Sequence, residues 1–164
     1  TSTIYAPGVS ARSCTRMASM DPHASSMDLR TQPPSVADYV HLRATCGLTT
    51  KTPAQAEPAI RNSWAWATVW VEERVVAMGR VIGDGGWYFH IADMATLPEF
   101  QRRGYGRAIL EHLLERIQAA APETPWITLF ADPPGRPLYA SMGFLPTASH
   151  GCEGMELAGQ IVNR

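Results

Sequence analysis

The chain has 164 residues, 45% of them hydrophobic and 18% charged, and its formal net charge at pH 7 is −1. This length and composition are those of one globular domain with a substantial core. A charge so close to zero argues against a dedicated nucleic-acid-binding protein, whose surface would be strongly basic. The sequence contains no apolar run long enough to span a membrane.

The first 26 residues have a composition of their own. They are rich in Ser, Ala, Thr and Met, and no acidic residue precedes Asp21. Because no clear amphipathic stripe accompanies this composition, we expect residues 1–26 to be a disordered leader, an alternative start or a cloning remnant. Residues 27–164 are then expected to form a single domain.

The three cysteines, Cys14, Cys46 and Cys152, lie far apart, and no C-x-x-C pair occurs. Such a sparse, odd set predicts neither a disulfide framework nor a zinc site. We therefore expect no metal and a reducing, cytoplasmic environment.

The segment from residue 27 to residue 97 predicts a strand, two helices and three more strands. Ser35 can cap the first helix, and Pro53 starts the second. From Trp64 onwards, aromatic and β-branched residues replace the helical pattern, and Gly83 to Gly86 give a strong turn signal. In chain order we expect a strand at 27–31, helices at 35–46 and 53–62, and strands at 64–71, 75–82 and 87–97.

Helices and strands alternate in the remaining sequence. A helix with apolar residues at helical spacing begins after a loop at 101–106 and stops before Pro122. Residues 126–131 lack alternation, as in a strand that is buried on both faces, and a short helix at 136–142 closes at Gly143. Further strands are expected from Phe144 and over 154–157. This order predicts an α/β fold with a mixed sheet.

The loop at 101–106 combines glycines with positive charge at the start of a helix. Arg102, Arg103 and Arg107 lie where a helix already presents unpaired backbone N–H groups and a partial positive charge. The glycines of the loop let a large ligand approach the backbone closely. These features predict an anion site, most naturally for a phosphate or pyrophosphate.

Other interpretations of this loop fit less well. A plain helix start with a glycine for packing would be the default for an isolated G-x-G. A nucleoside-triphosphate loop needs Lys and then Ser or Thr after the glycines, and none follows. A dinucleotide-binding fingerprint needs a third glycine, where Ile109 stands, and an acid about 20 residues later.

A more specific match covers the loop and a second segment. Leu97-Pro98-x-x-Gln101-Arg102-Arg103-Gly104-Tyr105-Gly106 resembles the acetyl-CoA-binding motif of the GNAT acetyltransferase superfamily, Q/R-x-x-G-x-G/A after a strand. Leu138-Tyr139-Ala140-Ser141-Met142-Gly143-Phe144 resembles the L-Y-x-x-x-G-F segment of the same superfamily. Residues 78–86 resemble the third and fourth strands of its small bacterial and fungal single-domain members. The resemblance extends over roughly residues 27–157.

The resemblance implies a fold and a cosubstrate. Residues 27–164 would form an acetyltransferase domain with a mostly antiparallel central sheet, flanked by helices, whose fourth and fifth strands splay apart. Loop N–H groups would hold the pyrophosphate of acetyl-CoA, and the end of the fourth strand would pair with its pantetheine arm as an added strand does. Asp132 lies where many members have an Asn, and a carboxylate there can accept but cannot donate. The implied cofactor-binding set is Met94, Ala95, Thr96, Gln101, Arg102, Arg103, Gly104, Tyr105, Gly106, Arg107, Asp132 and Tyr139.

The resemblance also implies catalytic roles. Tyr139 would be the general acid that protonates the departing thiolate, although a packed aromatic is the alternative, and the Met94 N–H would be the oxyanion donor. His90 lies where the histone-acetylating branch has its catalytic Glu, and its imidazole titrates near neutrality. Asp93 is the rival base, or an anion that attracts an ammonium group, and a water chain without a dedicated base is a third possibility. Strand alternation would put His90, Ala92 and Met94 on one face and Ile91, Asp93 and Ala95 on the other.

The expected activity is direct transfer of an acetyl group to a primary amine, because neither motif contains a Cys that could form an acyl-enzyme. The acceptor is expected to be a small molecule, namely an aryl- or alkylamine, a polyamine, an amino sugar or an amino acid. The alternatives are protein acetylation at a lysine or N-terminus and, in another class, a non-catalytic CoA-binding sensor or scaffold. We expect a monomer or homodimer with no nucleic-acid or membrane partner.

Overall fold

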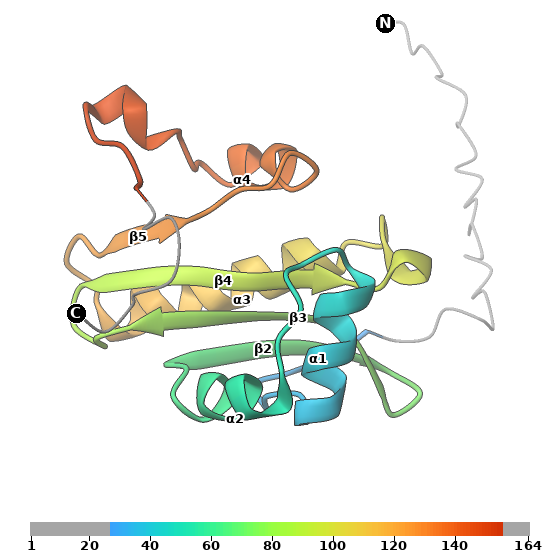
Figure 1. The fold of residues 1–164 in the computed structure, drawn as a ribbon. Coiled ribbons are helices and arrows are strands. Elements are labelled where there is room, and N and C mark those ends of the chain that lie inside the picture. Colours follow the sequence, from blue (N-terminus) through green and yellow to red (C-terminus); the bar gives the residue numbers. More distant parts are fainter. Residues whose placement is uncertain (1–26, 156–164) are drawn as a thin grey trace, which may run out of the picture.

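The computed structural model describes residues 27–155, so the leader expected at 1–26 lies outside the described residues. None of the helices in this part of the chain is long and apolar enough to cross a membrane. In chain order the elements are β1 (Asp28–Arg30), α1 (Val36–Thr45), α2 (Pro53–Arg61), β2 (Ala65–Val71), β3 (Arg74–Gly83), β4 (Tyr88–Thr96), a 3₁₀ turn (Pro98–Phe100), α3 (Tyr105–Ala120), β5 (Trp126–Leu129), α4 (Arg136–Ser141) and a second 3₁₀ turn (Thr147–His150) (Figure 1).

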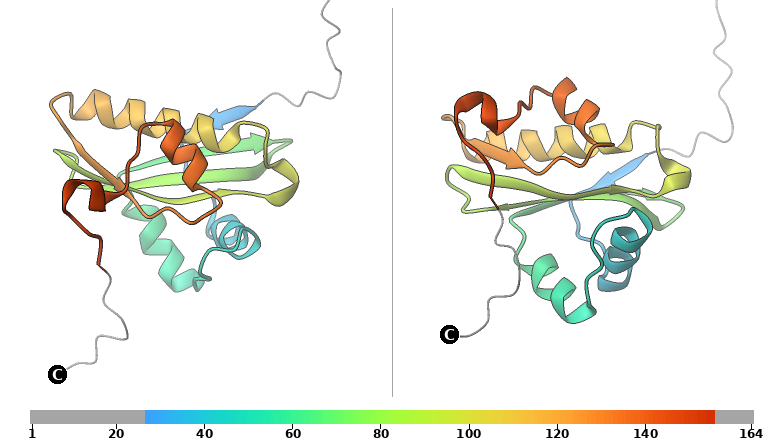
Figure 2. Two further views of the ribbon diagram at one scale, coloured as in Figure 1. Left: turned by 90° about the horizontal axis from the view of Figure 1, so that it is seen from above. Right: turned by 45° about the horizontal axis from the view of Figure 1, so that its top comes forward.

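The five strands form one sheet in the order β1-β2-β3-β4-β5. Neighbours from β1 to β4 are antiparallel, and β5 runs parallel to β4. Helices α1 and α2 cover one face of the sheet and α3 covers the opposite face, while α4 follows β5 at the edge of the sheet (Figure 2). The α/β fold with a mixed, mostly antiparallel sheet flanked by helices is therefore confirmed.

Local capping explains where the first helices begin. The Ser35 hydroxyl accepts a hydrogen bond from the Asp38 N–H at 3.1 Å, as an N-cap residue should. At α2, the side chain of Thr52 and that of Gln55 form a reciprocal capping box. The first helix start was predicted from Ser35 and the second from Pro53, whereas the capping box of Thr52 and Gln55 was not anticipated.

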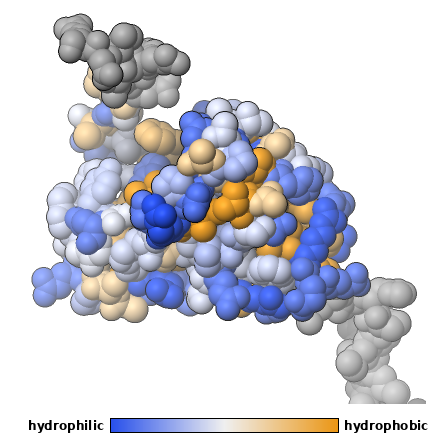
Figure 3. All heavy atoms as spheres, turned by 60° about the horizontal axis from the view of Figure 1, so that its bottom comes forward, coloured by the Kyte–Doolittle hydropathy of each residue, from blue (hydrophilic) through white to orange (hydrophobic). Residues whose placement is uncertain are grey.

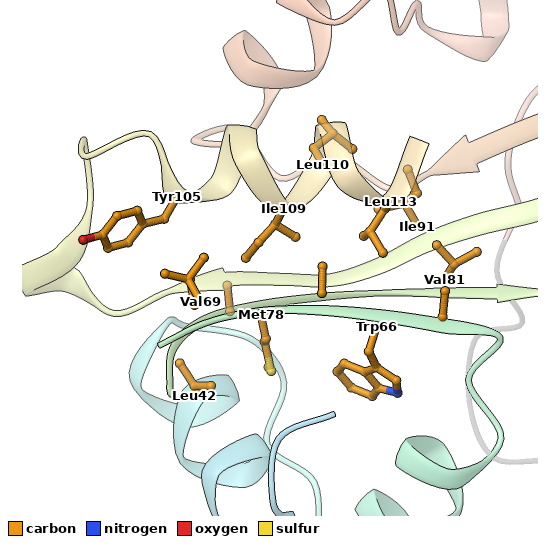
Figure 4. Packing of buried hydrophobic residues seen from close by; sticks show 14 of the residues in the cluster. Leu42, Trp66, Val69, Met78, Val81, Ile91, Tyr105, Ile109, Leu110 and Leu113 are labelled. Atoms are coloured by element: carbon orange, nitrogen blue, oxygen red, sulfur yellow. The ribbon is translucent and has the colours of Figure 1, made fainter. Parts of the chain in front are cut away.

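The core lies on both faces of the sheet. Above it, α3 buries Ile109, Leu110, Leu113 and Ile117, and below it Met78 and Leu42 pack between β3 and α1 (Figure 4). Full burial of each such side chain stabilises the fold by about 1.5–3 kcal/mol. The core holds β4 and α3 rigidly, and these two elements carry most of the predicted site.

The fourth and fifth strands separate after a short paired stretch. Their register runs from Tyr88 opposite Trp126 to Ile91 opposite Leu129, where β5 ends. Strand β4 continues to Thr96 without β5 beside it. The splay expected from the resemblance is present, and it leaves one edge of β4 open.

A β-bulge interrupts β4 where this open edge begins. Ala92 pairs with Arg80 and Ala95 pairs with Met78, so Asp93 and Met94 together oppose Gly79. Asp93 has φ = +54°, a left-handed conformation that residues other than glycine rarely adopt. The extra residue reverses the alternation of the strand beyond this point.

The predicted face assignment on β4 is therefore wrong beyond Ala92. A Cβ built on Gly79 would lie 2.5 Å from Met94 Sδ and 2.7 Å from Ile109 Cγ2, so Met94 faces α3. The Asp93 side chain reaches α1 on the opposite face, where its carboxylate accepts from Tyr39. A bulge depends on the partner strand, and strict alternation along one strand cannot anticipate it.

The strand predicted from Phe144 is also wrong. Residues 144–146 have no regular structure, and a 3₁₀ turn follows at Thr147–His150. The Phe144 N–H donates to the Tyr139 carbonyl at 3.1 Å, around Gly143 with φ = +90°, and Pro146 has no N–H to offer a ladder. Gly154 and Met155 lie in no strand, and residues 156 and 157 of the last predicted strand lie outside the described part.

Candidate active site

The two sequence motifs meet where the start of α3 contacts α4. The guanidinium of Arg107 donates to Ser141 Oγ at 2.7 Å and to Met142 Sδ at 3.0 Å. A Cβ added to Gly106 would lie 3.5 Å from Leu138 Cδ2, an ordinary contact distance. Residues 101–107 and 138–144 thus form one continuous surface, although they are far apart in the sequence.

The loop before α3 is braced by its own side chains. The Gln101 amide donates to the Thr96 carbonyl at 3.1 Å, and the Arg103 guanidinium donates to the Glu99 carbonyl at 3.0 Å. Gly104 has φ = +85°, and no atom lies within 4 Å of a Cβ built on it. The backbone at the helix start is therefore both fixed in shape and open to a ligand.

The predicted loop residues differ in whether their side chains are accessible to a ligand. Arg102, Arg103 and Arg107 have exposed side chains. Tyr105 is only 6% exposed and its ring packs into the core, so it can offer its backbone alone (Figure 4). The open edge of β4 at Met94, Ala95 and Thr96 leads directly into this loop.

A cavity of about 1080 Å³ lies between the paired stretch of β4 and β5, α4 and the segment after α4. His90 and Tyr139, two of the predicted catalytic residues, both line it. Most other lining side chains are apolar or aromatic, and no Asp or Glu is among the described residues around it. Met94, Asp93 and the loop at 101–107 do not line the cavity, so the predicted residues form two adjoining groups.

His90 is held in the sheet by its neighbours on β5. Its Nδ1 lies 2.9 Å from Thr128 Oγ1, and its ring centroid lies 5.2 Å from that of Phe130. Burial and the positive charge of Arg80 lower the pKa of His90, and the opposing effect of Asp93 is smaller. The imidazole is therefore neutral at neutral pH and able to accept a proton.

Tyr139 is positioned by Gly135 and Phe144. A Cβ on Gly135 would come within 2.8 Å of the tyrosine ring, and the rings of Tyr139 and Phe144 meet edge to face at 6.2 Å. Burial, and then the charge of the exposed Asp132, raise the pKa of the Tyr139 phenol. The hydroxyl therefore keeps its proton at neutral pH.

Asp93 lies in a cluster of charges on the α1 side of the sheet. Its carboxylate accepts from the Tyr39 hydroxyl at 2.6 Å, from Arg80 Nε at 2.6 Å and from Arg43 Nη1. Burial would raise the pKa of Asp93, but the Tyr39 hydrogen bond and the charges of Arg80 and Arg43 outweigh it, and the net pKa is lowered. Asp93 is therefore a poor proton acceptor.

The sequence motifs gave no indication of Tyr39, Arg43 or Arg80. One available signal was a single arginine within the otherwise apolar run Val75–Ile82, which predicts a buried cation that needs a partner. Nothing in the sequence pointed to Arg43, since its partner lies 50 residues away.

A family model described as an acetyltransferase (GNAT) domain matches residues 65–146, which is half of the chain. Among solved structures, a protein of unknown function from meticillin-resistant Staphylococcus aureus, described as a probable acetyltransferase, is 35% identical. Its TM-score is 0.76, and the match covers 82% of this chain and 100% of that one.

Curated relatives match over shorter stretches. A chloroplastic GCN5-related N-acetyltransferase 1 from Arabidopsis thaliana is 32% identical over 62% of this chain and 52% of its own length. A [ribosomal protein bS18]-alanine N-acetyltransferase from Salmonella typhimurium is 38% identical over 42% of this chain and 45% of its own length. The chain thus spans about half the length of the curated relatives it matches. The matched domain, the agreement with a complete solved structure and the meeting of the two motifs establish that the chain belongs to the GNAT acetyltransferase family.

Proposed function

We propose that the chain is an acetyl-CoA-dependent N-acetyltransferase that moves the acetyl group directly to a primary amine. The observation that carries this proposal is the juxtaposition of the motif loop, the open edge of β4 and a cavity lined by both His90 and Tyr139. A thioester laid along β4 would end beside two groups with opposite proton chemistry. One is a histidine with a lowered pKa and the other a tyrosine with a raised pKa.

In this proposal the cosubstrate is held mainly by backbone. The N–H groups from Arg102 to Arg107 bind the pyrophosphate, with Gln101 bracing the loop, and the charges of the exposed arginines add to the attraction. The edge at Met94, Ala95 and Thr96 pairs with the pantetheine arm. Asp132 contributes charge beside Tyr139 and an acceptor only, because a carboxylate cannot donate.

The transfer then proceeds in two proton-coupled stages. His90, directly or through a water, takes a proton from the ammonium form of the acceptor, and the free amine attacks the thioester carbonyl carbon. The Met94 N–H stabilises the negative oxygen that forms. When the carbon–sulfur bond breaks, Tyr139 gives its proton to the departing thiolate. The nitrogen of the intermediate, which still carries two protons, returns one to the tyrosine oxygen, directly or through a water, so that the neutral amide and the phenol are both restored.

The cavity favours a small acceptor with aromatic or apolar character. Its volume suits a small ligand, and its aromatic side chains include Tyr88, Trp126, Phe130 and Phe144. A polyamine would carry further positive charges into a lining where the described residues supply no carboxylate. Among the acceptors considered, an arylalkylamine therefore fits better than a polyamine.

Acetylation of a protein N-terminus is the second candidate. Its support is the relative from Salmonella typhimurium, which is named for the alanine of a ribosomal protein. Phe130 and Leu145 beside the cavity are 75% and 66% exposed, so a peptide could extend over this rim.

The deciding experiment measures CoA release with matched panels of small amines and of peptides that begin with a free amine. Turnover with an arylalkylamine supports the first proposal, and turnover with peptides alone replaces it with the second. Calorimetry with acetyl-CoA runs beside the assay. Binding without transfer to any member of either panel would identify a non-catalytic sensor or scaffold, and absence of binding would refute the whole proposal.

A further inference from the structure

We propose that Asp93 is a positioning residue that holds the bulge of β4 in the shape the thioester needs, and that it does not act as the base. The proposal rests on the proposed transfer function for its catalytic meaning. It concerns the cluster of Asp93, Tyr39, Arg43 and Arg80, which we call the bulge clamp.

The first argument is conformational. Asp93 adopts φ = +54° within a bulge, at the point where β4 loses its partner β5. A non-glycine residue keeps such a conformation only where its surroundings over-determine it, and such positions cluster at active sites. The next peptide carries the Met94 N–H, so the torsions at Asp93 set the direction of that group.

The second argument is the number of donors on one carboxylate. The Asp93 side chain is 10% exposed and accepts from three groups, which come from α1 and β3. A base must be free to take a proton from the substrate, whereas every one of these donors favours the ionised, occupied form.

The third argument is that the arginines are themselves fixed. Arg43 Nε donates to the Thr49 carbonyl at 2.9 Å, beyond the end of α1. Arg80 Nη1 donates to Ser63 Oγ at 3.0 Å and to the Ala59 carbonyl at 3.3 Å, at the end of α2. The clamp thus ties the two helices of this face to the strand that receives the thioester. Figure 3 shows the molecule turned so that this side, the bottom of Figure 1, comes toward the viewer.

The clamp also lies close enough to His90 to act on it by charge, because Arg80 pairs with Ala92 and Ile82 pairs with His90, which puts Arg80 and His90 on one face of the sheet. The charges that shift its pKa come from Arg80 on β3, which lowers it, and from Asp93 on β4, which raises it. Tyr39 and Arg43 on α1 act through Asp93, β5 contributes the neutral Thr128, and the neutral Phe130 follows directly after β5. Removing each of the two charges should therefore move the titration of His90 in opposite directions.

The first test compares Asp93→Asn with Asp28→Asn, a control in which the aspartate also lies on a strand and pairs with an arginine but is exposed. Asparagine tolerates positive φ and can still accept from Tyr39. We expect kcat to fall by less than about tenfold, with a higher KM for acetyl-CoA. A loss of about 10²–10⁴ in kcat, as for removal of a general base, together with disappearance of the acidic limb of the pH profile, would overturn the proposal.

The second test follows the acidic limb of the pH dependence of kcat/KM and the NMR titration of His90. Arg80→Gln should move both to higher pH, and Asp93→Asn should move both to lower pH. Arg74→Gln, which changes an exposed arginine on the same strand, is the control. Shifts in the same direction, or no shift in either variant, would overturn the electrostatic part of the proposal.

The third test needs no turnover. We expect the Ala95 amide, which lies beside the bulge and opposite Met78 of β3, to exchange with solvent faster in Tyr39→Phe and Asp93→Asn than in the wild type, and calorimetry to show weaker binding of acetyl-CoA. Unchanged exchange in both variants would overturn the clamp. If the wild-type chain binds acetyl-CoA but acetylates no amine, the proposed transfer fails, and this exchange measurement still decides whether the clamp exists.

Discussion

The two sides of β4 differ in whether their polar groups are free or already paired. On the side of α3 and α4, the motif loop exposes backbone N–H groups and arginine side chains, and Gly104 leaves space around them. On the side of α1, the carboxylate of Asp93 is buried and fully used by three donors. An exchangeable ligand needs donors that are oriented but free, whereas a fixed backbone shape needs donors and acceptors that are already paired.

This contrast separates residues that would react with or bind a ligand from residues that hold the backbone of β4 in position. In the proposed mechanism Tyr139 belongs to the first kind, and it lines the same cavity as His90. Asp93 belongs to the second kind. Variants on the two sides should therefore affect different quantities, and each prediction below tests that division.

The largest effect is expected at Tyr139. In Tyr139→Phe the ring still packs against Phe144 and Gly135, but the proton for the departing thiolate is gone. Loss of a general acid costs about 10²–10⁴ in rate, so kcat should fall by that factor while the calorimetric affinity for acetyl-CoA stays nearly unchanged. A wild-type rate in this variant would return Tyr139 to the role of a packed aromatic.

On the other side of the strand, Asp93→Ala should mainly cost stability. It leaves the buried charges of Arg43 and Arg80 without their partner, and breaking a buried ion pair costs about 3–5 kcal/mol. Urea unfolding measures the difference. Asp28→Ala removes an exposed strand aspartate and should cost less than about 1 kcal/mol. Equal losses in the two variants would contradict the distinction between the two sides.

The difference in unfolding free energy between the wild type and Asp93→Ala should also depend on pH. Because the folded-state pKa of Asp93 is lowered, its stabilising contribution is present above its ordinary pKa of about 3.9 and is lost as the pH falls through the folded value. The gap in unfolding free energy between wild type and Asp93→Ala should therefore narrow below about pH 3.9. A gap that stays constant down to pH 2 would show that the lost contacts were not those of the carboxylate.

The two sides were also unequally predictable from the sequence. Glycines at 104, 106 and 143, an apolar helical period and the spacing of L-Y-x-x-x-G-F are local signals, and they correctly indicated the loop, α3 and α4. The bulge is not local, because it exists only relative to Gly79 on the neighbouring strand. Arg43 likewise meets Asp93 only after the helix has folded over the sheet.

The mistaken strand at Phe144 has the same origin. The apolar, aromatic start of this segment is typical of a strand. The Phe144 N–H, however, donates to the Tyr139 carbonyl at the end of α4 and is not available for a hydrogen bond to a neighbouring strand. The roles of His90, Tyr139 and the loop remain predictions. Local chemistry thus predicted where a ligand could bind, and only the tertiary structure revealed what fixes the strand behind it.

A smaller effect is expected at Gly104. Gly104→Ala must place an L side chain at φ = +85°, which costs about 1–2 kcal/mol of stability. The added methyl group also stands where the phosphate is proposed to approach, so the affinity for acetyl-CoA should fall by about tenfold. Gly47→Ala is the matched control, because Gly47 has φ = +77° and equally open space but follows α1 and belongs to neither sequence motif. The control should lose a similar unfolding free energy but keep its affinity for acetyl-CoA. If both variants lost affinity, the effect at Gly104 would be explained by general destabilisation and not by contact with the phosphate.

The smallest effect is expected from a single charge on the loop. Arg102 is exposed, so Arg102→Gln should leave stability unchanged and weaken acetyl-CoA binding by about two- to fivefold, the range of a screened surface pairing. Arg61→Gln, at the exposed end of α2, is the control and should change neither quantity. Because the Debye length falls from about 10 Å at 0.1 M salt to about 3 Å at 1 M, the difference between Arg102→Gln and wild type should vanish at high salt. A difference in affinity that persists at 1 M salt would mean that Arg102 contacts the ligand directly. The loop would then contain both side chains that bind the ligand and side chains that only add charge.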